Sequence, residues 1–186
     1  MLQAFAFESV GVVVGDIYFV DPDPAPGQEG AERGVRLEVR LMERSAHDGS
    51  VYASRPIVIG RPLWRVDLLE TVDGSPGSYD RTHHHPSMTG WEPGERRFER
   101  ELSADPLGWL KQRLGDLSAL LDGAGLPPGA VDEGDAQRMR DSAAEIVSTV
   151  ERLLARVRDG ELGRPPAGGG MAVPAEPPTL VRSGWL

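Results

Sequence analysis

Hydrophobic and polar residues alternate along the first half of the chain, and this alternation predicts β-strands. It is clearest over residues 35–44, where Val35, Leu37 and Val39 alternate with charged residues. Such a pattern is typical of a strand with one buried face and one solvated face, as antiparallel sheets have. The same reasoning predicts further strands over residues 9–20, 51–59, 63–70 and 79–85.

Glycine and proline mark the connections between these predicted strands. A proline-rich segment makes residues 21–34 an exposed loop, because proline cannot donate to a strand ladder. The Asp48-Gly49 pair favours the turn of a hairpin whose return strand is 51–59. Pro56 lies inside that return strand, which is therefore expected at a sheet edge or interrupted there.

In the second half, apolar residues recur every three or four positions and predict two helices. Asp105 followed by proline is typical of a helix start, and leucines continue the stripe to residue 121. A longer helix is predicted over residues 132–158, with a heptad-like seam. The seam consists of Met139, Ala143, Ile146, Val150, Leu153 and Val157.

Together these elements predict an α+β protein: an antiparallel sheet of about five strands followed by two helices and a disordered C-terminal tail. Residues 1–124 are the expected α+β core domain, and residues 130–159 the expected long C-terminal helix. From Gly160 to the end, glycine, proline and alanine dominate without periodicity, so residues 160–186 are the expected tail.

Composition narrows the possible functions. The net charge of -9 argues against general binding to nucleic acid, and the absence of cysteine excludes disulfides and thiolate metal sites. No apolar run approaches the roughly 20 residues of a membrane span. We therefore expect a soluble, acidic, cytoplasmic protein without membrane partners. The abundance of Arg, Ala, Gly and Pro, with one lysine, suggests an actinobacterial source.

Three of the four histidines lie in residues 79–86, Tyr-Asp-Arg-Thr-His-His-His-Pro. On a strand, His83 and His85 point to one face with Cα atoms about 7 Å apart, a spacing that suits Zn²⁺, Fe²⁺, Ni²⁺ or Cu²⁺. The neighbouring predicted strand could present Asp67 on that face. The sequence therefore predicts a site for a divalent metal such as Zn²⁺, made of Asp67, His83 and His85. The other acidic candidates are Glu92, Glu95 and Glu99.

The same segment also supports metal-free chemistry. Histidine titrates near neutral pH, so His83 and His85 could act as the acid and base of a small hydrolase. Arg81 could hold a phosphate or carboxylate with its forked guanidinium, and Tyr79 could donate to developing charge. These four residues are the catalytic candidates. The set would suit cleavage of a phosphodiester, with RNA as the natural substrate.

A third interpretation needs no catalysis. Consecutive histidines on a strand can be an ordinary solvated face, and ion pairs around them add little stability. The protein would then act through its long helix, residues 132–158, and its tail. That helix could form a homodimer or bind a partner protein.

Three motifs between residues 60 and 120 support a resemblance. They are Asp80-x-x-His83-x-His85-Pro86, Gly90-Trp91-Glu92-Pro93 and Asp105-Pro106-Leu107-Gly108-Trp109-Leu110. They resemble a small actinobacterial family of unknown function, which implies no activity. A fainter resemblance is to TumE-type toxins, where Tyr-Asp precedes a His-rich stretch and an apolar helix. Tyr79-Asp80, the three histidines and residues 107–121 follow that order. This resemblance favours RNA cleavage and implies a toxin-like ribonuclease.

Overall fold

The computed structural model describes residues 1–43, 49–54 and 56–166. Each strand of its main antiparallel sheet pairs with the next in sequence: β1 (Leu2–Ala6), β2 (Val10–Val20), β3 (Ala31–Glu43), β4 (Val58–Thr71) and β5 (His83–His85). β6 (Met88–Thr89) and β7 (Glu92–Pro93) form a small second sheet. The helices are α1 (Arg100–Ala104), α2 (Pro106–Leu114), α3 (Leu117–Leu121) and α4 (Glu133–Arg158). The α+β class and the five-stranded antiparallel sheet are confirmed.

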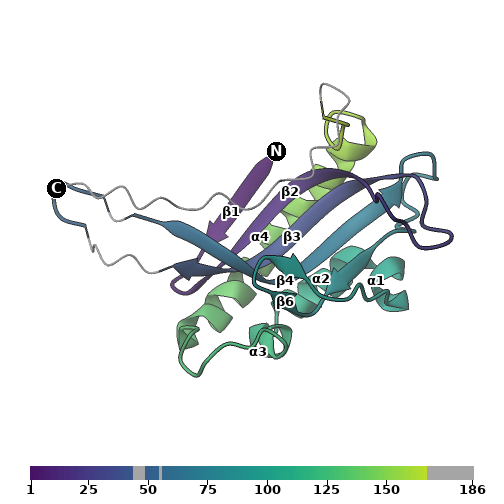
Figure 1. Cartoon of the computed structure of the whole chain (residues 1–186). Helices are drawn as coiled ribbons and strands as arrows, with labels where there is room; N and C mark the ends of the chain where they lie inside the picture. The colour runs from purple at the N-terminus through teal and green to yellow at the C-terminus, as the bar shows by residue number, and fades with distance from the viewer. Residues whose placement is uncertain (44–48, 55, 167–186) are drawn as a thin grey trace.

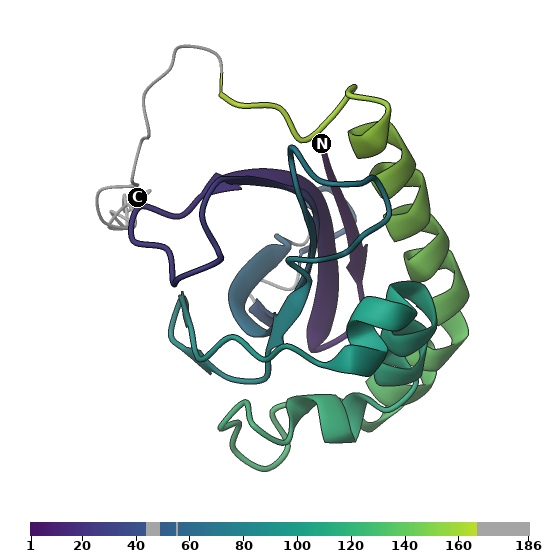
Figure 2. The ribbon, with the colours of Figure 1, turned by 90° about the vertical axis from the view of Figure 1, so that its right-hand side faces the viewer.

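The main sheet curls strongly, and the helices cover its outer face (Figures 1 and 2). Alternate valines and leucines of β2, β3 and β4 form the core with leucines of α2 and the seam of α4. All six predicted seam residues are buried there, the most exposed being Ala143 at 4%. The seam therefore packs against the protein's own core. A partner that binds α4 would have to contact the charged face of this helix instead.

The predicted return strand, residues 51–59, is wrong for most of its length. Residues 51–54 and 56–57 are not in a strand, and Val51 and Tyr52 are almost fully exposed. The predicted strand 63–70 instead belongs to the 14-residue β4, which begins at Val58. Pro62 falls where the ladder with β3 shifts register, so the ladder tolerates a proline there. Residues 44–48 of the predicted hairpin lie outside the described residues.

β3 begins earlier than the alternation predicts, inside the expected loop 21–34. Gly34 explains the extension, because a Cβ atom there would lie 1.9 Å from the carbonyl oxygen of Leu68. Only glycine allows the two strands to approach this closely. β1 was not predicted either. It pairs along β2 at the edge of the sheet, with Leu2 71% exposed.

The helical half also differs in its details. The predicted helix 105–121 is two helices, because the chain turns at Gly115 and Asp116 starts α3 by accepting from the backbone N–H of Ala119. The short α1 precedes them, so the described part of the chain has four helices rather than the two predicted. α4 agrees with the predicted long helix. Within the described residues, no helix is long and apolar enough to cross a membrane. Residues 167–186 of the predicted tail lie outside those residues.

Candidate metal centre

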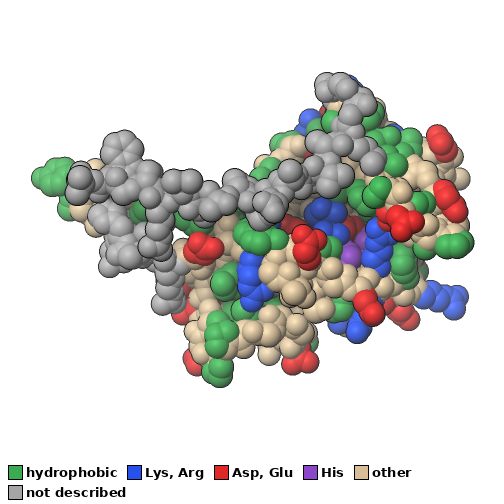
Figure 3. Space-filling view, in the orientation of Figure 1, with side chains coloured by type: hydrophobic (Ala, Val, Ile, Leu, Met, Phe, Trp, Pro, Cys, Tyr) green, Lys and Arg blue, Asp and Glu red, His purple; other side chains and the backbone are tan. Residues whose placement is uncertain are grey.

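The helices cover the outer face of the sheet, which carries the core. The opposite face, called the open face below, carries charged side chains. Residues paired directly across strands point to the same face. Pairing of Arg36 with Asp67, and of Asp67 with His83, sets these three side chains in a row. Arg65 and His85 form the next such pair on this face. Figure 3 looks onto this side of the molecule and shows basic and acidic side chains around a histidine.

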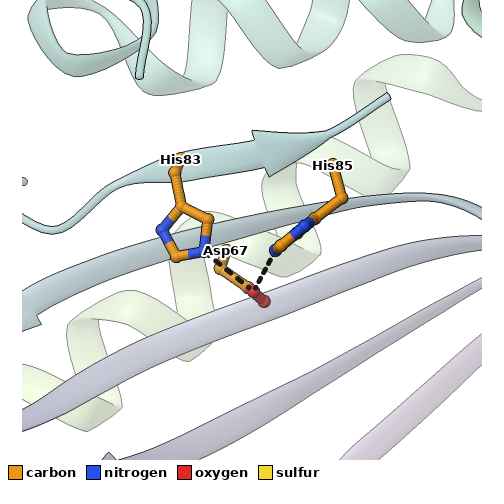
Figure 4. Close-up of side chains that lie close together, drawn as sticks. All are labelled: Asp67, His83 and His85. Carbon is orange, nitrogen blue, oxygen red and sulfur yellow. Dashed lines mark ion pairs between the residues drawn. The ribbon is translucent and has the colours of Figure 1, made fainter. Parts of the chain in front are cut away.

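Asp67, His83 and His85 bring three ligand atoms together (Figure 4). Nε2 of His83 lies 3.5 Å from Oδ2 of Asp67, and Nε2 of His85 lies 3.8 Å from the same oxygen. Tetrahedral zinc ligands at about 2.1 Å from the ion lie about 3.4 Å apart, so both separations are near that spacing. All three ligand atoms lie within 4.8 Å of one another, and the side chains are buried. The three predicted ligands thus form a group that could hold a metal ion.

The β5 strand is shorter than predicted, but its register is the one the site needs. Only His83–His85 is strand, whereas residues 79–82 form a turn. The turn is fixed by Asp80, whose carboxylate accepts from the backbone N–H of Thr71 and from the hydroxyl of Ser78. The predicted strand over residues 79–85 is therefore wrong for residues 79–82.

Backbone carbonyls decide which nitrogen of each ring carries its proton. Nδ1 of His83 lies 2.8 Å from the carbonyl oxygen of Arg81, and Nδ1 of His85 lies 2.7 Å from that of Gly94. A carbonyl oxygen only accepts, so each Nδ1 donates its N–H. In the neutral ring Nε2 then carries a lone pair, which faces Asp67. Such a second hydrogen bond is typical of metal-binding histidines.

Burial keeps both rings neutral at neutral pH. It lowers the pKa of His83 although the negative charge of Asp67 opposes the shift. The pKa of His85 falls to about 4, because burial and the positive charge of Arg65 both disfavour the imidazolium. The neutral ring is the form that binds a metal ion. Both Nε2 lone pairs are therefore available at neutral pH.

Two arginines keep Asp67 ionised. Arg36 donates from Nε to Oδ1 at 2.7 Å and from Nη2 to Oδ2 at 3.3 Å. Nε of Arg65 lies 2.9 Å from Oδ2, but it is not aligned for a hydrogen bond. Burial alone would raise the pKa of Asp67. The positive charges of Arg36 and Arg65 outweigh burial, and the pKa lies below its ordinary value.

Arg65 also competes with a metal ion for His85. Its Nη2 donates to Nε2 of His85 at 3.0 Å, since a guanidinium has donors only. A metal ion on that nitrogen requires Arg65 to withdraw. Arg36 and Arg65 were not among the site residues predicted from the sequence. Both arginines lie at polar positions of strands that alternate between polar and apolar residues, and this pattern was the signal that could have identified them.

Tyr79 and Arg81, the other catalytic candidates, lie apart from the ligand atoms. Tyr79 packs beneath Arg158, whose guanidinium carbon is 4.9 Å from the ring centroid. The Arg81 guanidinium donates to the carbonyl oxygen of Gly27 at 2.6 Å. Among the described residues, no hydrogen bond or ion pair links either side chain to the three ligand residues. Arg81 contributes through its backbone, which accepts from His83.

His84 points to the opposite, helix-covered face of the sheet. Its Nε2 lies 2.9 Å from Oε1 of Glu99, and its ring packs against Trp64 and Trp109. Glu99 also accepts from the indole N–H of Trp109 at 3.0 Å. His84 therefore ties β5 to the helices, and its neighbours His83 and His85 alone face the metal group.

Comparison of the chain with protein-family models, curated proteins and solved structures finds no match. The molecule is therefore classified by its own fold and site. It is an α+β protein whose curled antiparallel sheet carries a buried Asp-His-His group that could hold a metal ion. The resemblances to an actinobacterial family and to TumE-type toxins stay predictions.

Proposed function

We propose that Asp67, His83 and His85 bind one divalent cation, with Zn²⁺ the leading candidate, and that the protein is a small metal-dependent hydrolase. One observation supports this most directly. Both imidazoles donate Nδ1–H to backbone carbonyls and direct an Nε2 lone pair at one carboxylate oxygen. Converging acceptors in a buried place are unfavourable without positive charge among them, and Arg36 and Arg65 supply part of that charge. A divalent cation satisfies all three together.

The ligand set also suits the proposed chemistry. Two histidines and one carboxylate are the ligands of some catalytic zinc sites, which leave a coordination position open. The ion would supply Lewis-acid activation of water and of a substrate oxygen. The chain's own residues orient the ligands: Arg36 fixes the carboxylate, and the carbonyls of Arg81 and Gly94 fix the two rings.

Metal analysis of tag-free protein tests the proposal. Wild-type protein, purified or reconstituted with Zn²⁺, should hold about one equivalent, and the double variant His83→Ala/His85→Ala should hold almost none. Zn²⁺ should raise the Tm of the wild type by mass action, but not that of the double variant. His84→Gln is the matched control, because it changes the middle histidine on the opposite face and should leave zinc uptake intact.

The result against the proposal is equally clear. Metal-free wild-type protein is offered Zn²⁺, Fe²⁺, Ni²⁺ and Cu²⁺ in turn. If it takes up no more of any ion than the double variant does, the metal centre does not exist.

A metal-free hydrolase is the second candidate, and the contact between Arg65 and His85 favours it. Nη2 of Arg65 already supplies a cationic donor to Nε2 of His85. His83 would then act as the base, with its Nε2 lone pair 3.5 Å from Asp67. Hydrolysis that survives a chelator and is abolished in His83→Ala would support this candidate. For an RNA substrate, growth arrest on expression should also depend on His83.

A further inference from the structure

The candidate metal centre holds two guanidinium groups beside a single carboxylate. Arg36 and Arg65 both lie within ion-pair distance of Asp67. Arg36 is aligned with both carboxylate oxygens. Nε of Arg65 lies close to Asp67 but is not aligned for a hydrogen bond. Nη2 of Arg65 donates to Nε2 of His85, whose ring is neutral. Among the described residues, Arg65 therefore has no aligned hydrogen bond to an anionic group.

The nearest other acid does not supply that partner. Glu38 stands opposite Arg65 in the strand register, but its carboxylate forms an ion pair with Arg40, at 3.0 Å from an Nε that is likewise not aligned for a hydrogen bond. On this part of the face, three arginines (Arg36, Arg40 and Arg65) therefore share two carboxylates. Arg65 thus shares its counterion Asp67 with Arg36, and a largely buried charge that is only partly balanced is unfavourable. The Arg65 side chain is 13% exposed, so a ligand can reach it from the open face.

We propose that the ligand of this site carries an oxyanion, as in a phosphate ester or a carboxylate, and that Arg65 binds it. A guanidinium presents paired donors that match either group. When Nη2 turns to the anion, Nε2 of His85 is released for the metal ion. Anion and metal should therefore favour each other's binding, and this coupling rests on the proposed metal centre.

A cavity beside the arginines gives the ligand room for an uncharged part. It has a volume of about 210 Å³ and lies on the same sheet face, with Arg36 in its wall. Val13, Gly15 and Ile17 line its apolar part. Asp16 and Glu38 also line the cavity, and their negative charge would repel an anion. We therefore place the anionic group of the ligand at Arg65 and its uncharged part in the cavity. A small anionic substrate with an apolar portion is the class that fits.

Calorimetric titration with sodium sulfate and sodium acetate tests the proposal on metal-free protein. Sulfate represents a phosphate ester and acetate a carboxylate. Wild-type protein should bind one of them, and Arg65→Gln should bind it at least about tenfold more weakly, because a charge-assisted hydrogen bond is lost. Arg65→Lys keeps the charge without the paired donors and should fall between. Arg61→Gln removes the same charge elsewhere on β4 and should match the wild type.

Two results overturn the anion site: wild-type protein that binds neither anion, or a folded Arg65→Gln variant with wild-type affinity. If Arg65→Gln does not fold, Arg65→Lys decides by the same comparison. A zinc titration with and without the bound anion then tests the coupling. Zinc affinity should rise at least about fivefold with the anion in the wild type and stay constant in the Arg65 variants. Because the anion titrations need no metal, failure to bind zinc leaves their result standing.

Discussion

At the scale of single residues, Glu99 shows how one carboxylate joins parts of the chain that the sequence does not connect. It accepts from His84 on β5 at 2.9 Å and from Trp109 on α2 at 3.0 Å, and Arg113 lies 3.4 Å away. Burial would raise the pKa of Glu99. The hydrogen bonds from Trp109 and His84 outweigh it, so the pKa lies below its ordinary value.

This depressed pKa gives a prediction with a defined sign. Because the unfolded chain binds the proton more tightly, the ionised carboxylate stabilises the fold above the ordinary value of 4.5, and this contribution is lost as the pH falls through the lower folded-state value. Glu99→Gln should therefore lower the free energy of unfolding by about 1–2 kcal/mol at pH 7 and by less at pH 3. Urea denaturation measures both.

The neighbouring exposed residue Glu95 supplies the control. Glu95→Gln should change the free energy of unfolding by no more than about 0.5 kcal/mol at either pH. An equal loss at both pH values in Glu99→Gln would mean that the ionised form of Glu99 contributes nothing special.

At the scale of elements, the side chain of Asp135 joins the first turn of α4 to the start of β2. The buried carboxylate of Asp135 accepts from the backbone N–H groups of Glu8, Ser9 and Val10 at 2.7–3.2 Å. Arg138 adds an ion pair at 2.9 Å. The carboxylate thus satisfies backbone donors of the preceding bend and fixes where the long helix crosses the sheet.

Asp135→Asn should be strongly destabilising. The amide of asparagine would direct its own N–H group at backbone donors, and the charge-assisted hydrogen bonds would be lost. We expect a loss of about 3 kcal/mol in the free energy of unfolding. Asp141→Asn, an exposed change on the same helix, should cost less than about 0.5 kcal/mol. Similar denaturation midpoints for the two variants would contradict the proposed role of Asp135.

At the scale of the whole molecule, one core joins segments that the sequence suggested were separate. Residues of β2, β3 and β4 pack in the same hydrophobic cluster as the buried seam of α4. Burial of each Leu, Ile or Val side chain is worth about 1.5–3 kcal/mol. The buried side chains of this kind on α4 together contribute about as much as the roughly 5–15 kcal/mol that separates a folded domain from its unfolded state.

Truncation tests this dependence directly. A chain of residues 1–131 should lose its cooperative thermal transition, because the outer face of the sheet would be open to water. A chain of residues 1–166 keeps every described core residue and should melt near the Tm of the full chain. A cooperative melt of the 1–131 chain would show that residues 1–124 do form an independent domain.

The periodicity of apolar residues predicted the fold well in strands and helices that have one buried face and one solvent-exposed face. The alternation in β3, the leucine stripe of α2 and the seam of α4 all follow from simple burial. It failed where backbone geometry decides the outcome. The register shift at Pro62 merges two predicted strands, the close approach at Gly34 extends a third, and the side chain of Asp80 turns the chain just before β5.

The sequence by itself determined that His83 and His85 share a face, because the two-residue repeat of a strand fixes side-chain direction. It favoured Asp67 as their acidic neighbour, and the register between β4 and β5 decided for Asp67. Only the tertiary structure decided their chemical state. The carbonyl of Gly94 and the guanidinium of Arg36 reach the site from 9 and 31 residues away in the chain. Hydrogen bonds and charges act through space, so their effect on the site appears only when the sheet is assembled.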